Sequence, residues 1–131
     1  MPDQDAVVYS ANPVNTHTDT HAWTDTIIPA MDYVVVADSV MTDTAKYADM
    51  VLPIAQWFEL EEVSNAGQTS SLNYNEKAID PLYESKPDPQ IVSELAQKLG
   101  LGDYFSLDNG GILKEMMDTP IGAALGQTVR I

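Results

Sequence analysis

A run of three consecutive valines between Tyr33 and Ala37 sets the strongest restriction on the fold of this chain. β-Branched residues in an uninterrupted apolar run are typical of a strand that is covered on both faces. Two shorter apolar runs, at residues 5–9 and 50–52, have the same character, and Pro53 closes the later one. The sequence therefore predicts three buried strands.

Helical patterns separate the three predicted strands. Residues 18–31 place apolar side chains on one side of a helix, although Pro29 and several threonines oppose it. Residues 42–48 predict a short helix with Thr42 as its N-cap. Strands that alternate with helices pair in parallel through right-handed crossovers. The predicted fold class is α/β, a partial doubly wound (Rossmann-like) parallel sheet of about three strands with flanking helices.

The remainder of the chain has a different texture. Residues 58–87 are polar and show neither strand nor helix periodicity, which is typical of a segment that wraps a surface or contacts a partner. A clear helix is predicted from Asp88, as its N-cap, to Gly100, as its stop, and a weaker one at 111–117. We expect three parts: 1–57, half of a Rossmann-like unit; 58–87, an irregular wrapping segment; 88–131, the helical C-terminal part of the same domain. Open sheets usually have about 4–6 strands, so three strands indicate part of a larger sheet.

Charge and composition exclude several classes of function. The 131 residues include 20 acidic and six basic side chains, for a net charge of −14, and no cysteine. Strong acidity opposes binding to nucleic acid or to an anionic membrane, and the absence of cysteine excludes a thiolate-bound metal within this chain. No signal peptide opens the sequence, and no apolar run approaches the ~18 residues that span a bilayer. We therefore expect no direct membrane contact by this segment, and its sequence indicates no particular cellular compartment.

Polar residues at the ends of the predicted strands are the candidate binding groups. In open α/β sheets, ligands bind outside the carboxyl ends of the strands. Those ends carry Asn12 with Thr16 nearby, then Ala37 and Asp38, then Ile54 after Pro53. An Asp carboxylate that faces paired N–H donors would suit a guanine edge or a ribose diol. From position alone, plain turn and cap roles are favoured for Asn12 and Asp38, and a plain N-cap role is favoured for Asp88.

Other groupings carry weaker chemical signals. His17 and His21 have the i, i+4 spacing of metal ligands, but no third ligand is specified and a polar helix start explains both. The cluster Glu59, Glu61 and Glu62 indicates a solvated face rather than an acid–base pair. The turn at 10–13 lacks a glycine-rich phosphate loop, and no nucleophile-elbow pattern occurs. We therefore predict no catalytic residue and no metal ligand in this chain.

Several sequence blocks resemble one family. The stretch YVVVADSVMTDTAKYADMVLP resembles a segment of the molybdopterin oxidoreductases of the dimethyl sulfoxide reductase family, in which a strand, a threonine-rich helix and a strand ending in Leu-Pro follow one another. The resemblance extends upstream to Asn12-Pro13 and downstream to Glu59, Asn65, KAIDP and KPDPQIVSELAQKLGL. It covers residues 6–101 in the family's order.

The resemblance implies a role in cofactor binding. Members of this family are large multi-domain enzymes that carry molybdenum or tungsten on two molybdopterin guanine dinucleotides, often with an iron–sulfur cluster. This segment resembles part of the α/β domain around one guanosine arm. The positions that match the family's nucleotide contacts are Asn12, Thr16, Ala37, Asp38, Ile54 and Asp88.

The resemblance also has departures and an alternative. Family members often have glutamine where Ala37 stands, so only a backbone contact is expected there. The usual Glu-Gly pair is replaced around residues 59–62. The cluster cysteines, the metal's protein ligand and the final β-barrel are missing, so we expect this segment to be inactive alone and to have the remaining domains of its parent enzyme as partners. The alternative is a freestanding acidic interaction module without cofactor, whose contact surface is 58–87.

Overall fold

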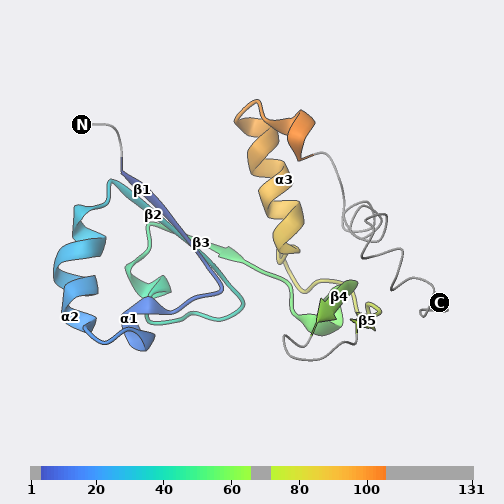
Figure 1. The fold of residues 1–131 in the computed structure, drawn as a ribbon, viewed down its shortest axis with the longest axis horizontal. Coiled ribbons are helices and arrows are strands. Elements are labelled where there is room, and N and C mark those ends of the chain that lie inside the picture. The colour runs from blue at the N-terminus through green and yellow to red at the C-terminus, as the bar shows by residue number, and fades with distance from the viewer. Residues whose placement is uncertain (1–3, 66–71, 106–131) are drawn as a thin grey trace. The chain divides into compact units, whose positions relative to one another are not determined.

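The computed structural model describes residues 4–65 and 72–105. Its main sheet contains three parallel strands in the order β1-β2-β3, with β1 at Asp5–Tyr9, β2 at Tyr33–Asp38 and β3 at Met50–Pro53 (Figure 1). Val7 pairs with Val35, and Val36 pairs with Val51. The predicted α/β class and the parallel pairing of the three strands are confirmed.

One face of this sheet carries the hydrophobic core. Parallel register and the alternation of side chains along a strand place Ala6, Val8, Val34, Val36 and Val51 on the same face. Val34, Val36 and Ala45 are buried there, and the residues packed against them include Ile28 and Met31 from the first crossover and Ala48 from the second. The crossovers therefore cover this face.

The first crossover is helical but irregular. It begins with the single turn α1 at Pro13–Thr16 and continues through α2 at Thr20–Ala22, a π-helical turn η1 at Trp23–Ile27 and a 3-10 turn η2 at Ile28–Ala30. Asp19 caps it, because its carboxylate accepts a hydrogen bond from the Ala22 N–H at 3.0 Å. Proline supplies no N–H to an α-helical ladder, and the geometry tightens where Pro29 lies. The predicted helix at 18–31 thus forms over 20–30 without uniform α geometry.

The second crossover is short, and Thr42 begins it. The Thr42 hydroxyl accepts a hydrogen bond from the Ala45 N–H at 3.2 Å, and the Thr42 carbonyl accepts one from the Lys46 N–H at 3.2 Å. The short helix predicted at 42–48 forms only as one 3-10 turn, η3 at Ala45–Tyr47. Asp49 then forms two hydrogen bonds with Val34. The Asp49 N–H donates to the Val34 carbonyl at 2.9 Å, and the Asp49 carboxylate accepts a hydrogen bond from the Val34 N–H at 2.8 Å.

A second, smaller sheet corrects the prediction that 58–87 is irregular. After the 3-10 turn η4 at Trp57–Glu59, β4 at Glu62–Asn65 pairs antiparallel with β5 at Leu72–Asn75. β5, with the sequence LNYN, alternates apolar and polar residues over only four positions, and β4, with the sequence EVSN, does not alternate. The strands form because their backbones pair with each other.

Helix α3 spans Asp88–Lys98 and is followed by the 3-10 turn η5 at Gly102–Tyr104. The N-cap is Pro87, whose carbonyl accepts hydrogen bonds from the Gln90 and Ile91 N–H groups at 3.0 and 3.1 Å. Asp88 is the first helical residue, so its predicted N-cap role is wrong. Gly100 has a φ of 75°, the left-handed conformation expected of a helix stop. The helix predicted at 111–117 lies outside the described residues.

The described residues form two compact units. The sheet unit comprises residues 4–55 and 82–85, and the hairpin unit comprises 56–65, 72–81 and 86–105. Within the described ranges, no helix has both the length and the apolar character needed to cross a membrane.

Candidate cofactor-binding site

The carboxyl ends of β1, β2 and β3 lie side by side in the sheet unit. The Ser10 N–H donates to the Ala37 carbonyl at 2.9 Å, and the Ile54 N–H donates to the Asp38 carbonyl at 3.3 Å. Ser10 has a φ of 45°, a left-handed conformation that is uncommon outside glycine, at the point where the chain leaves β1. Five of the six predicted contact residues, all except Asp88, belong to this sheet unit.

Asn12 is held by a bridge to the loop that follows β2. Its side-chain oxygen accepts hydrogen bonds from the Thr44 N–H at 3.1 Å and from the Thr44 hydroxyl at 2.8 Å. The same hydroxyl accepts a hydrogen bond from the Val14 N–H at 3.1 Å, and Thr44 is buried. We call this arrangement the Asn12–Thr44 bridge. It connects the segments that follow β1 and β2 through two residues that are 32 positions apart in sequence.

The bridge leaves one end of the Asn12 side chain for a ligand. With the oxygen bonded to Thr44, the amide nitrogen is the remaining polar group, and no described residue accepts a hydrogen bond from it. Asn12 is partly exposed. The arrangement therefore presents a neutral hydrogen-bond donor whose orientation is already determined.

Thr16 supports the turn around Asn12. It ends α1, and its hydroxyl donates to the Asn12 carbonyl at 2.9 Å, while its N–H donates to the same carbonyl at 2.9 Å. Thr16 is exposed, so its hydroxyl lone pairs remain accessible. Its observed contacts stabilise the loop, and any contact with a ligand would be as an acceptor.

Asp38 presents a carboxylate at the end of β2. Oδ1 accepts a hydrogen bond from the Ser39 N–H at 2.7 Å, which directs the carboxylate along the turn after the strand. Its weaker contacts, with the Ser39 hydroxyl and the Val40 N–H at 3.5 Å, also involve Oδ1. No described residue donates to Oδ2, and Asp38 is partly exposed. One oxygen thus positions the turn, and the other is available to a donor.

Ala37 and Ile54 contribute through the backbone of the sheet. Ala37 is 0% exposed, and its carbonyl accepts the Ser10 N–H, so it offers a ligand no accessible surface. The Ile54 N–H is bonded to Asp38, and its side chain is partly exposed. Ala37 therefore shapes the strand end, whereas Ile54 supplies apolar surface.

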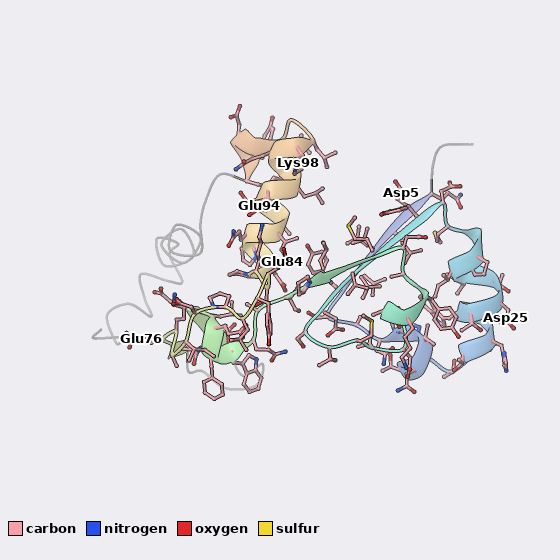
Figure 2. All side chains as sticks on the ribbon, turned by 180° about the vertical axis from the view of Figure 1, so that it is seen from behind. Asp5, Asp25, Glu76, Glu84, Glu94 and Lys98 are labelled. Carbon is pink, nitrogen blue, oxygen red and sulfur yellow. The ribbon has the colours of Figure 1, made fainter. Side chains whose placement is uncertain are left out.

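The charge of the sheet unit opposes the direct binding of phosphates. Lys46 is the single Lys or Arg among residues 4–55, and its ammonium lies 2.7 Å from Asp43. The hydrogen bond that the Lys46 ammonium donates to the Asp43 carboxylate raises the pKa of Lys46. Acidic side chains such as Asp5, at the beginning of β1, and Asp25, on the helical crossover, add negative charge to the unit (Figure 2).

Asp88 lies in the hairpin unit, at the beginning of α3. Partial burial raises the pKa of its carboxyl. In the first turn of a helix a carboxylate is favoured by the unpaired N–H groups. This geometry supports a role for Asp88 at the terminus of the helix. A contact between Asp88 and a nucleotide stays a prediction.

The two histidines have other partners. The His17 ring lies edge-on to Trp23, with ring centroids 5.1 Å apart, and His21 Nδ1 lies 3.3 Å from the exposed Asp25 carboxylate. The hydrogen bond from Thr24 is the main cause that lowers the pKa of Asp25, with a further contribution from His21. Within residues 4–65 and 72–105, no three His, Cys, Asp or Glu side chains gather as a ligand set for a metal.

Glu59 corrects the prediction of a solvated acidic face. It is 6% exposed, and its carboxylate accepts a hydrogen bond from the Gln56 N–H at 2.9 Å, which closes the turn η4. Asn75 fastens the same turn, because its amide donates to the Trp57 carbonyl at 2.7 Å and to the Leu60 carbonyl at 3.0 Å. Glu61 is exposed, as predicted.

Thr44 is the site residue that sequence reasoning missed. Its role depends on a partner 32 residues away, so no local pattern identifies it. The available signal was the density of threonines in 42–44, which indicated a helix start and led only to Thr42.

Comparison with known proteins now adds the family. The sequence profile of the molybdopterin oxidoreductases matches residues 2–98. A protein of Halobacterium salinarum, assigned as the catalytic subunit of dimethyl sulfoxide reductase, is 43% identical over 83 residues, which are 63% of this chain and 10% of that protein. A trimethylamine-N-oxide reductase of Vibrio vulnificus is 32% identical over 109 residues, 81% of this chain and 13% of that protein.

Solved structures show the same fold. Acetylene hydratase from Pelobacter acetylenicus superposes with a TM-score of 0.71 and 26% sequence identity, over 81% of this chain and 15% of that protein. The chain thus spans roughly a tenth of the length of the curated relatives that it matches. Because the family's sequence profile matches residues 2–98 and the relatives above share this stretch, the chain belongs to the molybdopterin oxidoreductases of the dimethyl sulfoxide reductase family.

Proposed function

We propose that this chain contributes to binding the guanosine arm of molybdopterin guanine dinucleotide in a molybdenum or tungsten oxidoreductase. The observation that carries the proposal is the Asn12–Thr44 bridge at the carboxyl edge of the sheet. It orients an amide donor, and the neighbouring strand ends in Asp38, whose Oδ2 is an available acceptor. A donor and an acceptor at one sheet edge fit a nucleoside.

The chemistry of these groups supports a guanosine ligand. A guanine base offers acceptors at O6 and N7 and a donor at its exocyclic amino group, and a ribose offers a diol. An oriented amide N–H suits the acceptors, and a carboxylate suits the amino group or the diol. Asn12 and Asp38 are the residues proposed to hold the nucleoside, with Ile54 beside them and Thr16 as a further acceptor.

The phosphates of the cofactor require other parts of the enzyme. Lys46, the single Lys or Arg among the described residues of the sheet unit, is already paired with Asp43. A pyrophosphate brought near this acidic unit would meet net repulsion unless cations arrive from elsewhere. We propose that the parent's other domains supply them. When bound, the molybdopterin supplies redox chemistry, whereas the residues of this chain bind and orient its nucleoside.

The organisation of the parent enzyme is part of the same proposal. The remaining domains are proposed to hold the metal's protein ligand and any iron–sulfur cluster, since this chain contains no cysteine. Residues 1–57 and 88–131 are proposed to belong to one domain, with 58–87 as the segment that wraps it. Asp88 is retained as a proposed nucleotide contact from α3.

A freestanding interaction module is the second candidate. Trp57 and Phe58 favour it, because both aromatic side chains are largely exposed on the closed turn η4. Exposed aromatic residues on a rigid turn are typical of protein contacts. The same exposure is expected if the other domains of a parent enzyme cover these side chains.

Nucleotide titration tests the proposed function. Isotope-labelled chain is titrated with GMP, and backbone amide shifts are followed by NMR, with AMP as the matched ligand that lacks the O6 and 2-amino groups. We expect saturable shifts near Asn12, Asp38 and Ile54 that are larger for GMP than for AMP. Equal shifts for both ligands, or no shifts at millimolar GMP, would count against recognition of guanosine.

A further inference from the structure

Two neighbouring apolar side chains are exposed in the loop that follows β2. Val40 and Met41, together called the Val40–Met41 pair, are each 63% exposed. Exposed apolar side chains are ordinary on a protein surface, so the position of the pair decides what it means. The pair follows the carboxyl end of β2, at the edge where open α/β sheets bind their ligands.

The loop that carries the pair is fixed at both ends by residues of the candidate site. At its beginning, Asp38 Oδ1 accepts hydrogen bonds from the next two backbone N–H groups, at 2.7 and 3.5 Å. At its end, the Thr44 N–H and hydroxyl donate to the side-chain oxygen of Asn12 at 3.1 and 2.8 Å. The Val40–Met41 pair therefore lies between the proposed acceptor and the residue that orients the proposed donor.

The backbone around Met41 is constrained as well. The Thr42 N–H donates to the Val40 carbonyl at 2.9 Å, which closes a three-residue turn with Met41 at its centre. The Thr42 hydroxyl accepts the Ala45 N–H at 3.2 Å and so anchors the turn to the next element. A loop that is ordered before a ligand arrives loses little conformational entropy on binding.

The contacts proposed so far leave the faces of the base without a partner. Asn12 and Asp38 offer a hydrogen-bond donor and an acceptor, which suit the polar edge of a base or the ribose diol. A purine also has two apolar π-faces, whose burial favours contact with apolar or polarizable groups. The methionine thioether is polarizable and makes favourable contacts with aromatic rings.

We propose that the Val40–Met41 pair packs against one face of the purine whose nucleoside is held by Asn12 and Asp38. This inference rests on the proposed function and deepens it, because it adds the group that holds the plane of the base. Every purine has such a face, so the pair binds guanine and adenine alike, and discrimination between them depends on the polar edge contacts.

Methyl NMR tests the contact directly. The chain carries ¹³C-labelled methionine methyl groups and is titrated with GMP, AMP and ribose 5-phosphate. We expect the Met41 methyl signal to move upfield in the ring current of either base, with the half-saturation of the Asn12 and Asp38 amide shifts. Ribose 5-phosphate, which has no base, should leave it in place. Met50, 45% exposed at the beginning of β3, is the internal control and should not move.

The same titration separates this inference from the proposed function. Saturable amide shifts at Asn12 and Asp38 with an unmoved Met41 methyl would overturn the inference and leave the function standing. A Met41 shift without those amide shifts would fail the function alone.

Matched substitutions give an affinity readout. Met41→Gln keeps the length of the side chain but makes it polar, whereas Met41→Leu keeps it apolar. We expect Met41→Gln to weaken GMP binding by about two- to tenfold, and Met41→Leu to weaken it less. Met50→Gln should leave the affinity unchanged. Equal affinities of the two Met41 variants would overturn the inference.

Methionine oxidation in the full-length enzyme decides whether the cofactor or the protein covers Met41. Hydrogen peroxide oxidises accessible methionine, and mass spectrometry gives the rates at Met41 and Met50 with and without bound cofactor. We expect the cofactor to slow oxidation of Met41 by about fivefold or more and to change that of Met50 by less than about twofold. Equally slow oxidation of Met41 in the cofactor-free enzyme would show that polypeptide covers it. Equally fast oxidation in the loaded enzyme would show that nothing does, and either result overturns the inference.

Discussion

The two units of this chain are stabilised in different ways. The sheet unit buries Val34, Val36 and Ala45 in a shared core beneath its crossovers. In α3 of the hairpin unit only Ala96 is buried, and Leu99 is 66% exposed. Among its described side chains, polar contacts include the Asn75 bonds to η4 and the Lys86–Glu94 ion pair at 2.6 Å. The difference indicates that the sheet unit has its own core and that the hairpin unit depends more on hydrogen bonds.

Truncating one apolar side chain in each unit should give the largest effect and the clearest contrast. We expect Val36→Ala to lower the free energy of unfolding by about 2 kcal/mol, through lost burial and a cavity. Leu99→Ala should cost at most about 0.5 kcal/mol, since its side chain is already largely hydrated. Urea titrations followed by fluorescence measure both: Trp23 reports the sheet unit in a Trp57→Phe background, and Trp57 reports the hairpin unit in a Trp23→Phe background. Equal losses would remove the distinction between the units.

Breaking the Asn12–Thr44 bridge should have the next largest effect. Thr44→Val keeps the shape of the side chain but removes the hydroxyl that Asn12 and Val14 share. The Val14 N–H is left without that acceptor in a buried position, so we expect a loss of about 1–2 kcal/mol in the sheet unit. Thr26→Val at an exposed position is the control, expected to stay within about 0.5 kcal/mol. A neutral Thr44→Val would show that the bridge is not a structural constraint.

Opening the turn η4 should have a smaller effect, confined to the hairpin unit. Glu59→Ala removes the acceptor of the Gln56 N–H, and we expect a loss of about 1 kcal/mol in the transition reported by Trp57. Glu59→Gln retains an acceptor oxygen and should lose less. If both variants match the unsubstituted chain, Glu59 does not hold the turn.

The smallest effects are expected from the titration of two carboxyl groups of α3, those of Asp88 and Glu94. Glu94 and Lys98 lie along this helix (Figure 2). The hydrogen bond from Lys86, followed by that from Gln90, lowers the pKa of Glu94, whereas burial raises the pKa of Asp88. Glu94 therefore adds stability above its unfolded pKa, which is lost as pH falls through the lowered folded pKa. Asp88 has the opposite effect on the free energy of unfolding. At low pH it costs no stability, and as the pH rises from its unfolded pKa to its raised folded pKa the protein loses stability.

Carboxyl NMR measures both groups in one experiment. The ordinary pKa of Asp, 3.8, lies below the ordinary pKa of Glu, 4.5. We expect the difference between the pKa of Asp88 and the pKa of Glu94 to be smaller than this or reversed. Lys86→Gln should raise the pKa of Glu94 and leave that of Asp88 unchanged. An ordinary gap in the unsubstituted chain would contradict the assigned environments.

The contrast between the units also explains what could be predicted from sequence. The valine run and the apolar positions of residues 18–31 are local patterns with strong physical causes, and the three parallel strands and the first crossover followed from them. The strand ends led to Asn12 and Asp38 because sheet topology places ligands there. Each of these inferences needed only neighbouring residues.

What escaped prediction depends on partners distant in sequence. Thr44 acquires its role from Asn12, and Glu59 is buried by a turn that Asn75 fastens from β5. The strands β4 and β5 form by pairing with each other, and only β5 shows an alternation of apolar and polar residues, over four positions. Asp88 was predicted as the N-cap because Asp is a preferred cap, but the chain enters α3 one residue earlier, at Pro87.

The proposal that Asp38 and Asn12 hold a guanosine at the sheet edge is tested most sharply by Asp38→Asn. The variant keeps Oδ1 for the Ser39 N–H and replaces the available Oδ2 by a donor. Full-length enzyme is purified, its cofactor is hydrolysed, and released GMP is measured per enzyme, with Asp43→Asn as the control of equal charge change. We expect Asp38→Asn to lose cofactor retention by about tenfold or more while Asp43→Asn retains it. Full GMP content in the Asp38→Asn enzyme would contradict the proposal.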